Sequence, residues 1–327
     1  MTPLVSILVP VYRVSAYIER CAHSLFGQTF QDVEYVFVDD ATPDDSMEKL
    51  AKVVACYPHR KEQVKIVHHS VNKGLACARN TAVAHACGVY LLQVDSDDYV
   101  EIDMVELLYH KAIETEADIV VCDFYRVCKG VQNVVTDAVY DDPDKNRSSI
   151  IASVQSCACV WNKLIKRDLY NKCHRLPLGM DYCEDRFIVV QLYFLTGKIA
   201  KINTPLYHYT TTNAASITAQ HRTRKHFENT FQCWDFLSAF LLEQGASEAE
   251  VNLLALEKIK RKASLMIATN STSLRKAYAS VWHEEETKYL PMLTRGKRVI
   301  LELVRRRWFG LAQMYHYGVV TGNRLFC

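Results

Sequence analysis

Three carboxylates within four positions, Asp95, Asp97 and Asp98, follow the apolar stretch that begins at Tyr90. Such a cluster could hold a hard divalent cation, which binds one or two carboxylates and takes its other ligands from water and phosphate oxygens. A simpler interpretation is also open, because acids after a strand often cap the next helix or lie in a solvated loop. Asp103 is well placed to cap the helix expected after it.

A second pair of acids, Asp39 and Asp40, ends another apolar run. A carboxylate at the tip of a strand can accept a hydrogen bond from a nucleobase N–H or a ribose hydroxyl. Further along, Gly74 permits a tight entry into a helix that carries Arg79 in its early turns. A helix N-terminus beside an arginine suits a phosphate group. A surface ion pair is the alternative role for Arg79.

The elements that must position these residues alternate between two periodicities. Between short runs rich in β-branched residues, apolar residues recur at helical spacing, as after Thr42 and Pro43, which we expect to be the N-cap and first residue of a helix. This alternation predicts a doubly wound, mainly parallel α/β sheet, in which ligands bind at the carboxyl ends of the strands. Both acidic groups therefore face one crevice. The predicted strands cover residues 4–11, 33–38, 64–68, 89–94 and 118–124.

Bulk composition excludes several classes of protein. The 327 residues, 49% hydrophobic and 23% charged, are typical of a globular chain, and a net charge of +2 gives no reason to expect nucleic-acid binding. The 12 cysteines form no CxxC pair, so we expect reduced thiols rather than a zinc site. No apolar run is long enough to span a membrane, and no basic leader precedes the first strand. We therefore predict a cytoplasmic protein.

The order and spacing of four stretches resemble the family 2 glycosyltransferases of the GT-A fold. These stretches are VSILVPVYR, SLFGQTFQDVEYVFVDDATPDDS, NKGLACARN and YLLQVDSDDYV, and together they cover nearly all of the first 125 residues. A looser resemblance to the second half of bacterial polysaccharide-biosynthesis members continues through VWNKLIKRDLY, EDRFI and LYHYTTTNAASIT.

The resemblance implies a nucleotide-diphospho-sugar donor, most often a UDP-sugar, and an Mg²⁺ or Mn²⁺ ion. By position, Asp40 would bond the uracil with support from Asp39, and Asp97 would hold the metal. Asp98 is left open as a second metal ligand. The other implied contacts to the nucleotide are Pro10, Tyr12, Arg79 and Asp95, of which Asp95 reaches the ribose side and is also a candidate metal ligand. Two departures from the family pattern are modest: Arg13 replaces Asn, and Ala41-Thr42 replaces Gly-Ser.

Transfer to an acceptor hydroxyl also requires a base that removes its proton. Enzymes of this family carry it in a Glu-Asp pair at the head of a helix, which implies Asp185, with Glu184 as the second candidate. Attack opposite the leaving group would invert the anomeric centre. The alternative is that both acids only favour the first turn of a helix. His208 is a further candidate metal ligand, although a histidine between tyrosines is more often packed and satisfied.

The implied organisation has three portions. Residues 1–125 form the nucleotide-sugar-binding α/β half, residues 126–219 the acceptor-side half, and residues 220–327 a helical C-terminal extension. The basic amphipathic stretch from Arg295 to Trp308 favours either contact with an anionic membrane surface, which suits a lipid-linked glycan acceptor on the inner face, or packing against the catalytic domain.

Other functions fit less well. A dinucleotide-dependent oxidoreductase needs G-x-G-x-x-G after the first strand, and a P-loop enzyme needs its lysine-containing glycine loop; neither motif is present. A catalytically silent module that binds a nucleotide-sugar is the main alternative. The acids at Asp40, Asp95, Asp97 and Asp185 argue against it.

Overall fold

The computed structural model describes residues 2–153, 155–213, 216–217 and 223–324. The chain divides into two compact units, residues 1–219 and 220–327. The expected division at residue 125 falls inside strand β6, so the two expected halves of the catalytic portion share one sheet. Residues 214–215 and 218 of the LYHYTTTNAASIT stretch lie outside the described residues.

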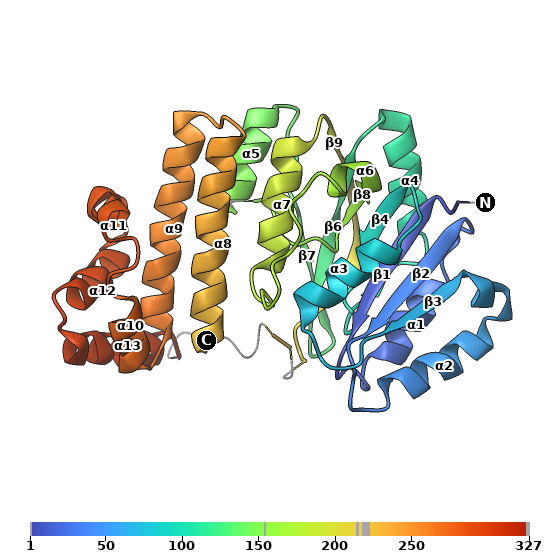
Figure 1. Ribbon diagram of the computed structural model, residues 1–327, viewed down its shortest axis with the longest axis horizontal. Coiled ribbons are helices and arrows are strands. Elements are labelled where there is room, and N and C mark those ends of the chain that lie inside the picture. The colour runs from blue at the N-terminus through green and yellow to red at the C-terminus, as the bar shows by residue number, and fades with distance from the viewer. Residues whose placement is uncertain (1, 154, 214–215, 218–222, 325–327) are drawn as a thin grey trace. The chain divides into compact units, whose positions relative to one another are not determined.

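The first unit is built on a mixed sheet whose described strands run in the order β3-β2-β1-β4-β8-β6-β9-β5, with β7 paired to β6 (Figure 1). Strands β3, β2, β1 and β4 are parallel, and β8 is antiparallel to both of its neighbours. The strands are β1 (Val5–Val11), β2 (Val33–Asp39), β3 (Val64–His68), β4 (Tyr90–Gln93), β5 (Tyr99–Val100), β6 (Ile119–Cys128), β7 (Val131–Val135), β8 (Lys163–Lys166) and β9 (Ile199–Thr210).

Helices connect and cover these strands. Every residue of β1 is buried, as expected for a strand that is covered on both faces. Helix α3 packs on β1 and β2, and α4 packs on β6 and β9. The helices of this unit are α1 (Ile18–Phe26), α2 (Ser46–Cys56), the 3₁₀ helix η1 (Pro58–Gln63), α3 (Leu75–His85), α4 (Met104–Thr115), α5 (Pro143–Ala152), α6 (Arg167–Tyr170) and α7 (Glu184–Leu195).

All five predicted strands are present, but the start predicted for α2 is wrong. The helix begins at Ser46, and Thr42 is not its N-cap. The Thr42 hydroxyl instead accepts a hydrogen bond from the Arg13 backbone and donates one to Asp44, which ties the turn after β2 to the turn after β1. This long-range contact outweighs the local preference for a helix at Pro43.

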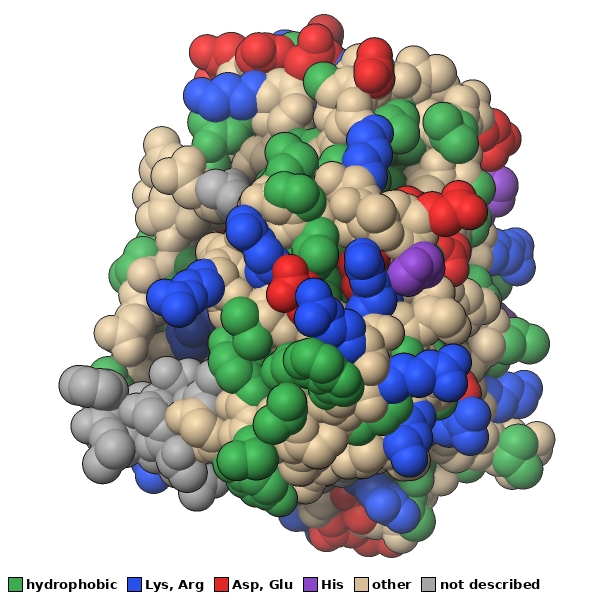
Figure 2. All heavy atoms as spheres, turned by 90° about the vertical axis from the view of Figure 1, so that its left-hand side faces the viewer, with side chains coloured by type: hydrophobic (Ala, Val, Ile, Leu, Met, Phe, Trp, Pro, Cys, Tyr) green, Lys and Arg blue, Asp and Glu red, His purple; other side chains and the backbone are tan. Residues whose placement is uncertain are grey.

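The second unit is helical. Apolar side chains from α8, α9 and α12, among them Phe227, Ile259 and Ile300, form its core. Its elements are α8 (Arg224–Glu243), α9 (Glu248–Ala268), α10 (Thr272–Tyr278), α11 (His283–Tyr289), the 3₁₀ helix η2 (Leu290–Met292), α12 (Arg295–Arg305) and α13 (Phe309–Arg324). Figure 2 shows a face of the molecule on which hydrophobic side chains lie among Lys and Arg side chains. None of the described helices combines the length and the apolar character needed to cross a bilayer.

Candidate active site

The carboxyl ends of the parallel strands bring the predicted acids to one edge of the sheet. Val11 at the end of β1 pairs with Asp39 at the end of β2, and the backbone N–H of Val94, just after β4, bonds to Leu8 of β1. The acids after β2 and β4 therefore flank the end of β1, where Tyr12 is exposed. Pro10 lies buried in β1, and its carbonyl accepts a hydrogen bond from Ser96.

The two acids after β2 have different surroundings. Both were predicted to face the crevice, but the side chain of Asp40 is only 3% exposed, against 14% for Asp39. The Asp40 carboxylate accepts hydrogen bonds from the backbone N–H groups of Lys73 and Gly74, each at 2.8 Å, and contacts His69 at 2.6 Å. Asp40 therefore fixes the loop before α3, and Asp39 is the more accessible of the pair.

The predicted phosphate site at the start of α3 is not supported by the structure. The Asp181 carboxylate already accepts a hydrogen bond from Ala76 N at 3.3 Å in the first turn of this helix. It also lies so close to Gly74, which has a φ of +88°, that a Cβ there would collide with it. The sequence offers no local indication of this contact, because 105 residues separate Asp181 from Ala76.

Arg79 joins the acids of two different elements. Its Nη2 lies 2.9 Å from Asp95 Oδ1, after β4, and 3.3 Å from Asp185 Oδ1 and 3.6 Å from Glu184 Oε1, in the first turn of α7. The guanidinium is buried, so Arg79 has neither of its two predicted roles, a surface ion pair or a direct contact with phosphate. Although burial opposes its charge, Asp95, Asp185 and Glu184 raise the pKa of Arg79. One cation thus holds the strand-end acid and the helix acids in a single site.

The two helix acids are held in an environment suited to proton transfer. Burial raises the pKa of Asp185 to about 6, while the charge of Arg79 opposes the increase. Burial and the neighbouring Asp185 raise the pKa of Glu184 well above its usual range. With a pKa of about 6, Asp185 is ionised near neutral pH and able to accept a proton.

The structure separates the roles of Asp97 and Asp98. The Asp98 side chain is fully buried and accepts hydrogen bonds from Tyr207 Oη at 2.7 Å and Thr210 N at 2.6 Å, both from β9. Asp97 is partly exposed, and its described carboxylate contact is with Asn213 Nδ2 at 2.8 Å. Asp97 is thus the accessible carboxylate, and Asp98 fixes this loop to the sheet.

A divalent cation fits these residues. Burial and the charge of Asp95 raise the pKa of Asp97, so two carboxylates repel each other where a cation would relieve the repulsion. No group of three or more His, Cys, Asp or Glu side chains arranged to hold a metal occurs among the described residues. Asp97 and Asp95 would therefore supply only part of the coordination shell, as expected for Mg²⁺ or Mn²⁺ bound together with a diphosphate.

His208 was predicted as a further metal ligand, but it does not lie with Asp97 and Asp95. Its ring is stacked between Tyr99 and Tyr125, with ring centroids at 4.1 and 4.6 Å, and its Nε2 lies 2.7 Å from Glu101 Oε1. Burial lowers its pKa. The alternative of a packed histidine therefore describes the ring stacking of His208, although its buried Nδ1 has no hydrogen-bond partner among the described residues.

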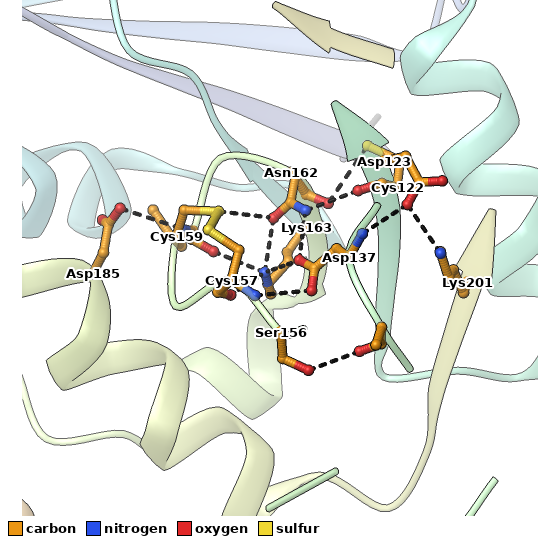
Figure 3. Close-up of polar contacts among 12 residues, drawn as sticks. Cys122, Asp123, Asp137, Ser156, Cys157, Cys159, Asn162, Lys163, Asp185 and Lys201 are labelled. Carbon is orange, nitrogen blue, oxygen red and sulfur yellow. Dashed lines mark hydrogen bonds and ion pairs between the residues drawn. A yellow bond between two sulfur atoms is a disulfide. The ribbon is translucent and has the colours of Figure 1, made fainter. Parts of the chain in front are cut away.

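A buried lysine that the sequence analysis did not single out supports the loop beside Asp185 (Figure 3). Lys163 Nζ lies 3.2 Å from Asp137 Oδ2, with both side chains fully buried, and donates to the carbonyls of Cys157 and Cys159 at 2.9 Å. The same loop places the backbone N–H of Val160 3.3 Å from Asp185 Oδ2. The one available indication was a lysine inside the apolar run VWNKLI.

Cys157 and Cys159, in this loop, are joined by a disulfide, although the sequence predicts reduced thiols. Their Cα atoms lie 5.3 Å apart, within the range for a disulfide. Among the other described cysteines, Cys56, Cys87 and Cys128 are exposed and form no disulfide.

Replacing Lys163 with Met is expected to lower the free energy of unfolding by about 3–5 kcal/mol, because it leaves Asp137 charged and buried without its partner. Lys166→Met is the matched control, since its ion pair with Asp118 is partly exposed and its loss should cost less than about 1 kcal/mol. Urea denaturation of both variants measures the difference. If both variants lost the same small amount of unfolding free energy, the buried pair would not stabilise the fold.

Comparisons with known proteins identify the family of this chain. The sequence profile "Glycosyl transferase family 2" matches residues 6–173. "Putative glycosyltransferase EpsH" of Bacillus subtilis (strain 168) is 30% identical over 255 residues, which cover 76% of this chain and 72% of that protein.

Solved structures show the same fold. S. aureus TarS 1-349 in complex with UDP aligns with a TM-score of 0.69 at 19% identity, over 98% of this chain and 92% of that one. Mannosyltransferase PcManGT from Pyrobaculum calidifontis, in complex with GDP-Man and Mn²⁺, aligns with a TM-score of 0.55 at 16% identity, over 96% of this chain and 86% of that one. At these identities the likeness concerns the GT-A fold alone.

Proposed function

Because the chain belongs to glycosyl transferase family 2 and is a glycosyltransferase of the polysaccharide-biosynthesis type, we propose that it moves a sugar from a UDP-sugar to a hydroxyl of a glycan or lipid-linked glycan, with inversion. The observation that carries this proposal is the position of Arg79, which holds Asp95 on the donor side and Asp185 in the acid pair of α7 around one guanidinium.

The donor side is formed by the ends of the parallel strands. Tyr12 and Asp39 are more accessible than Pro10 and Asp40, so we assign the base and ribose contacts to the first two and propose that Pro10 and Asp40 shape that pocket. Asp97, with Asp95 beside it, would hold Mg²⁺ or Mn²⁺. When bound, such a cation neutralises the charge that develops on the departing diphosphate.

The acceptor side is formed by Asp185. Its carboxylate removes the proton of the acceptor hydroxyl, whose oxygen attacks the anomeric carbon of the donor. The bond between that carbon and the diphosphate oxygen breaks, and its electron pair leaves with the nucleoside diphosphate. Attack on the face opposite this leaving group inverts the anomeric configuration. Burial and Asp185 raise the pKa of the neighbouring Glu184, which disfavours a second negative charge beside the base.

We place this reaction in the cytoplasm. Cys56, Cys87 and Cys128 are exposed and form no disulfide, which is typical of a reducing compartment; the Cys157–Cys159 disulfide is an exception to this pattern.

A thermal-shift series with UDP-, GDP- and dTDP-sugars, each with and without Mn²⁺, tests the donor assignment. A ligand at about 100 times its Kd stabilises the native state by about 2.7 kcal/mol. We expect the UDP-sugars to raise the Tm, and Mn²⁺ to increase that rise. A Mn²⁺-dependent rise with GDP-sugars alone would contradict the choice of uridine.

Measuring the release of UDP from the donors that bind distinguishes the enzyme from the silent module. Transfer to an acceptor, or slow Mn²⁺-dependent hydrolysis of the donor, supports a glycosyltransferase. Tight binding with no turnover under any condition would support the module.

A further inference from the structure

Four large hydrophobic side chains lie exposed at the junction of α12 and α13, and we call them the Trp308 patch. Trp308, Leu311, Met314 and Tyr317 are each between 49% and 70% exposed. Leu311, Met314 and Tyr317 follow one another at intervals of three along α13, so they lie along one side of the helix. Exposed hydrophobic patches beside polar residues mark sites of contact with proteins or membranes.

The bend of the chain at Arg307 creates this patch. Arg307 has a φ of +60°, and the backbone N–H groups of Arg307 and Trp308 bond back to the carbonyls of Val304 and Leu303. This left-handed turn ends α12 and places Trp308 at the corner before α13. Arg307 lines the same open depression as Trp308, Leu311 and Met314.

Exposed basic side chains directly precede the patch in the chain. Between Arg295 and Arg307 the chain carries six Lys or Arg residues and one acid, Glu302. Arg305, Arg306 and Arg307 are exposed, and the guanidinium of Arg306 lies 5.3 Å from the centroid of the Trp308 ring. Positive charge and exposed apolar surface therefore occur together at this corner.

The apolar side of α12 is already buried within the helical unit, so it is not available to bind a partner. Ile300, Leu301 and Val304 are buried in the core of the helical unit, so the charged side of this helix faces outward. Of the two alternatives left open for this stretch, the packed one describes the apolar face of α12, which lies within the core of its own unit. The Trp308 patch lies beyond α12, and its side chains are exposed rather than buried in this core.

We propose that the Trp308 patch and the arginines around it dock on the surface of an anionic lipid bilayer. Tryptophan and tyrosine are enriched at the membrane interface, where an apolar ring with a polar edge meets both environments. Clustered Lys and Arg residues are attracted to anionic headgroups. Since no described helix crosses a bilayer, the attachment is peripheral. It does not depend on the proposed sugar transfer, and it would bring a lipid-linked acceptor and the enzyme to the same surface.

Flotation of the full chain with vesicles tests this proposal. Vesicles of phosphatidylcholine alone are compared with vesicles of equal parts phosphatidylcholine and phosphatidylglycerol. We expect flotation with the anionic vesicles only, at least about tenfold above the neutral ones, and weaker binding as salt is added.

Two independent sets of substitutions locate the surface. Trp308→Ser with Leu311→Ser and Met314→Ser removes the apolar contact, and Arg305→Gln with Arg306→Gln and Arg307→Gln removes the charge. The matched controls are Leu107→Ser with Ile113→Ser and Lys52→Gln with Lys61→Gln, which change exposed residues of the first unit. We expect both test sets to reduce flotation at least about tenfold and both control sets to leave it unchanged.

Three outcomes would overturn the proposal. The first is no flotation with anionic vesicles, and the second is flotation that neither test set reduces. The third is a dimer, detected by light scattering, that the apolar substitutions dissociate into monomers while lipid binding is unchanged. The circular dichroism spectra and melting temperatures of all variants show whether a loss of flotation reflects unfolding. If one set of substitutions unfolds the protein, the other set still tests the proposal.

Discussion

Replacing Asp185 with Asn is expected to lower kcat by about 10²- to 10⁴-fold, the usual contribution of a general base. The amide has nearly the shape of the carboxylate but cannot accept the acceptor proton. Since Arg79 keeps its contacts with Asp95 and Glu184, the donor side should be preserved. Steady-state kinetics give kcat, and the thermal shift with UDP and Mn²⁺ should equal that of the wild type.

The pH dependence of the wild-type enzyme provides a second measurement of the same role. Burial raises the pKa of Asp185 to about 6, so the base is ionised above that pH and protonated below it. We expect kcat/KM to fall about tenfold for each pH unit below the pKa, and this acidic limb to disappear in Asp185→Asn.

Asp168→Asn is the matched control for this substitution, because Asp168 is an exposed acid on α6. It should leave both kcat and the pH profile unchanged. Near-normal turnover of Asp185→Asn with intact donor binding would show that another group removes the proton, and Glu184→Gln would then be the variant to measure.

Replacing Asp97 with Asn is expected to reduce metal-dependent turnover by about 10³-fold, since a catalytic cation supplies several kcal/mol of charge stabilisation. The loss arises because the one accessible carboxylate of the Asp97–Asp98 pair becomes a neutral amide, a poorer ligand for a hard cation. Titration of Mn²⁺ in the presence of UDP should show a weaker apparent affinity in the same variant.

Asp98→Asn separates this effect from a structural one. Asp98 accepts hydrogen bonds from Tyr207 and Thr210 in a fully buried position, so its replacement should lower the free energy of unfolding by about 1–3 kcal/mol. Its Mn²⁺ titration should change less than that of Asp97→Asn. A larger loss of Mn²⁺ affinity in Asp98→Asn than in Asp97→Asn would mean that the two roles are reversed.

Residue patterns were sufficient to predict the α/β sheet and the edge at which its acids meet. The five predicted strands follow from runs of β-branched residues, and the convergence of Asp39 and Asp95 follows from the parallel order of those strands. The position of Glu184 and Asp185 at the start of α7 was also predictable, from the resemblance to the family.

The contacts that assign a role to each acid were not predictable, because their partners lie far away in the sequence. Asp98 is fixed by Tyr207, 109 residues later, and Asp40 by the N–H groups of Lys73 and Gly74, more than 30 residues later. Periodicity describes neighbours along a strand or helix and carries no information about such pairs. For the same reason the stacking of His208 between Tyr99 and Tyr125 could only be recognised in the folded chain.

A crystal structure of this chain with UDP and Mn²⁺ is the most direct test of the donor site. We predict a manganese ion bound to the Asp97 carboxylate and to the diphosphate, with the uracil near Tyr12 and Asp39 and with Asp185 open to the acceptor side. A nucleotide bound elsewhere, or a diphosphate with no metal while Asp97 still pairs with Asn213, would contradict the assignment of this edge of the sheet.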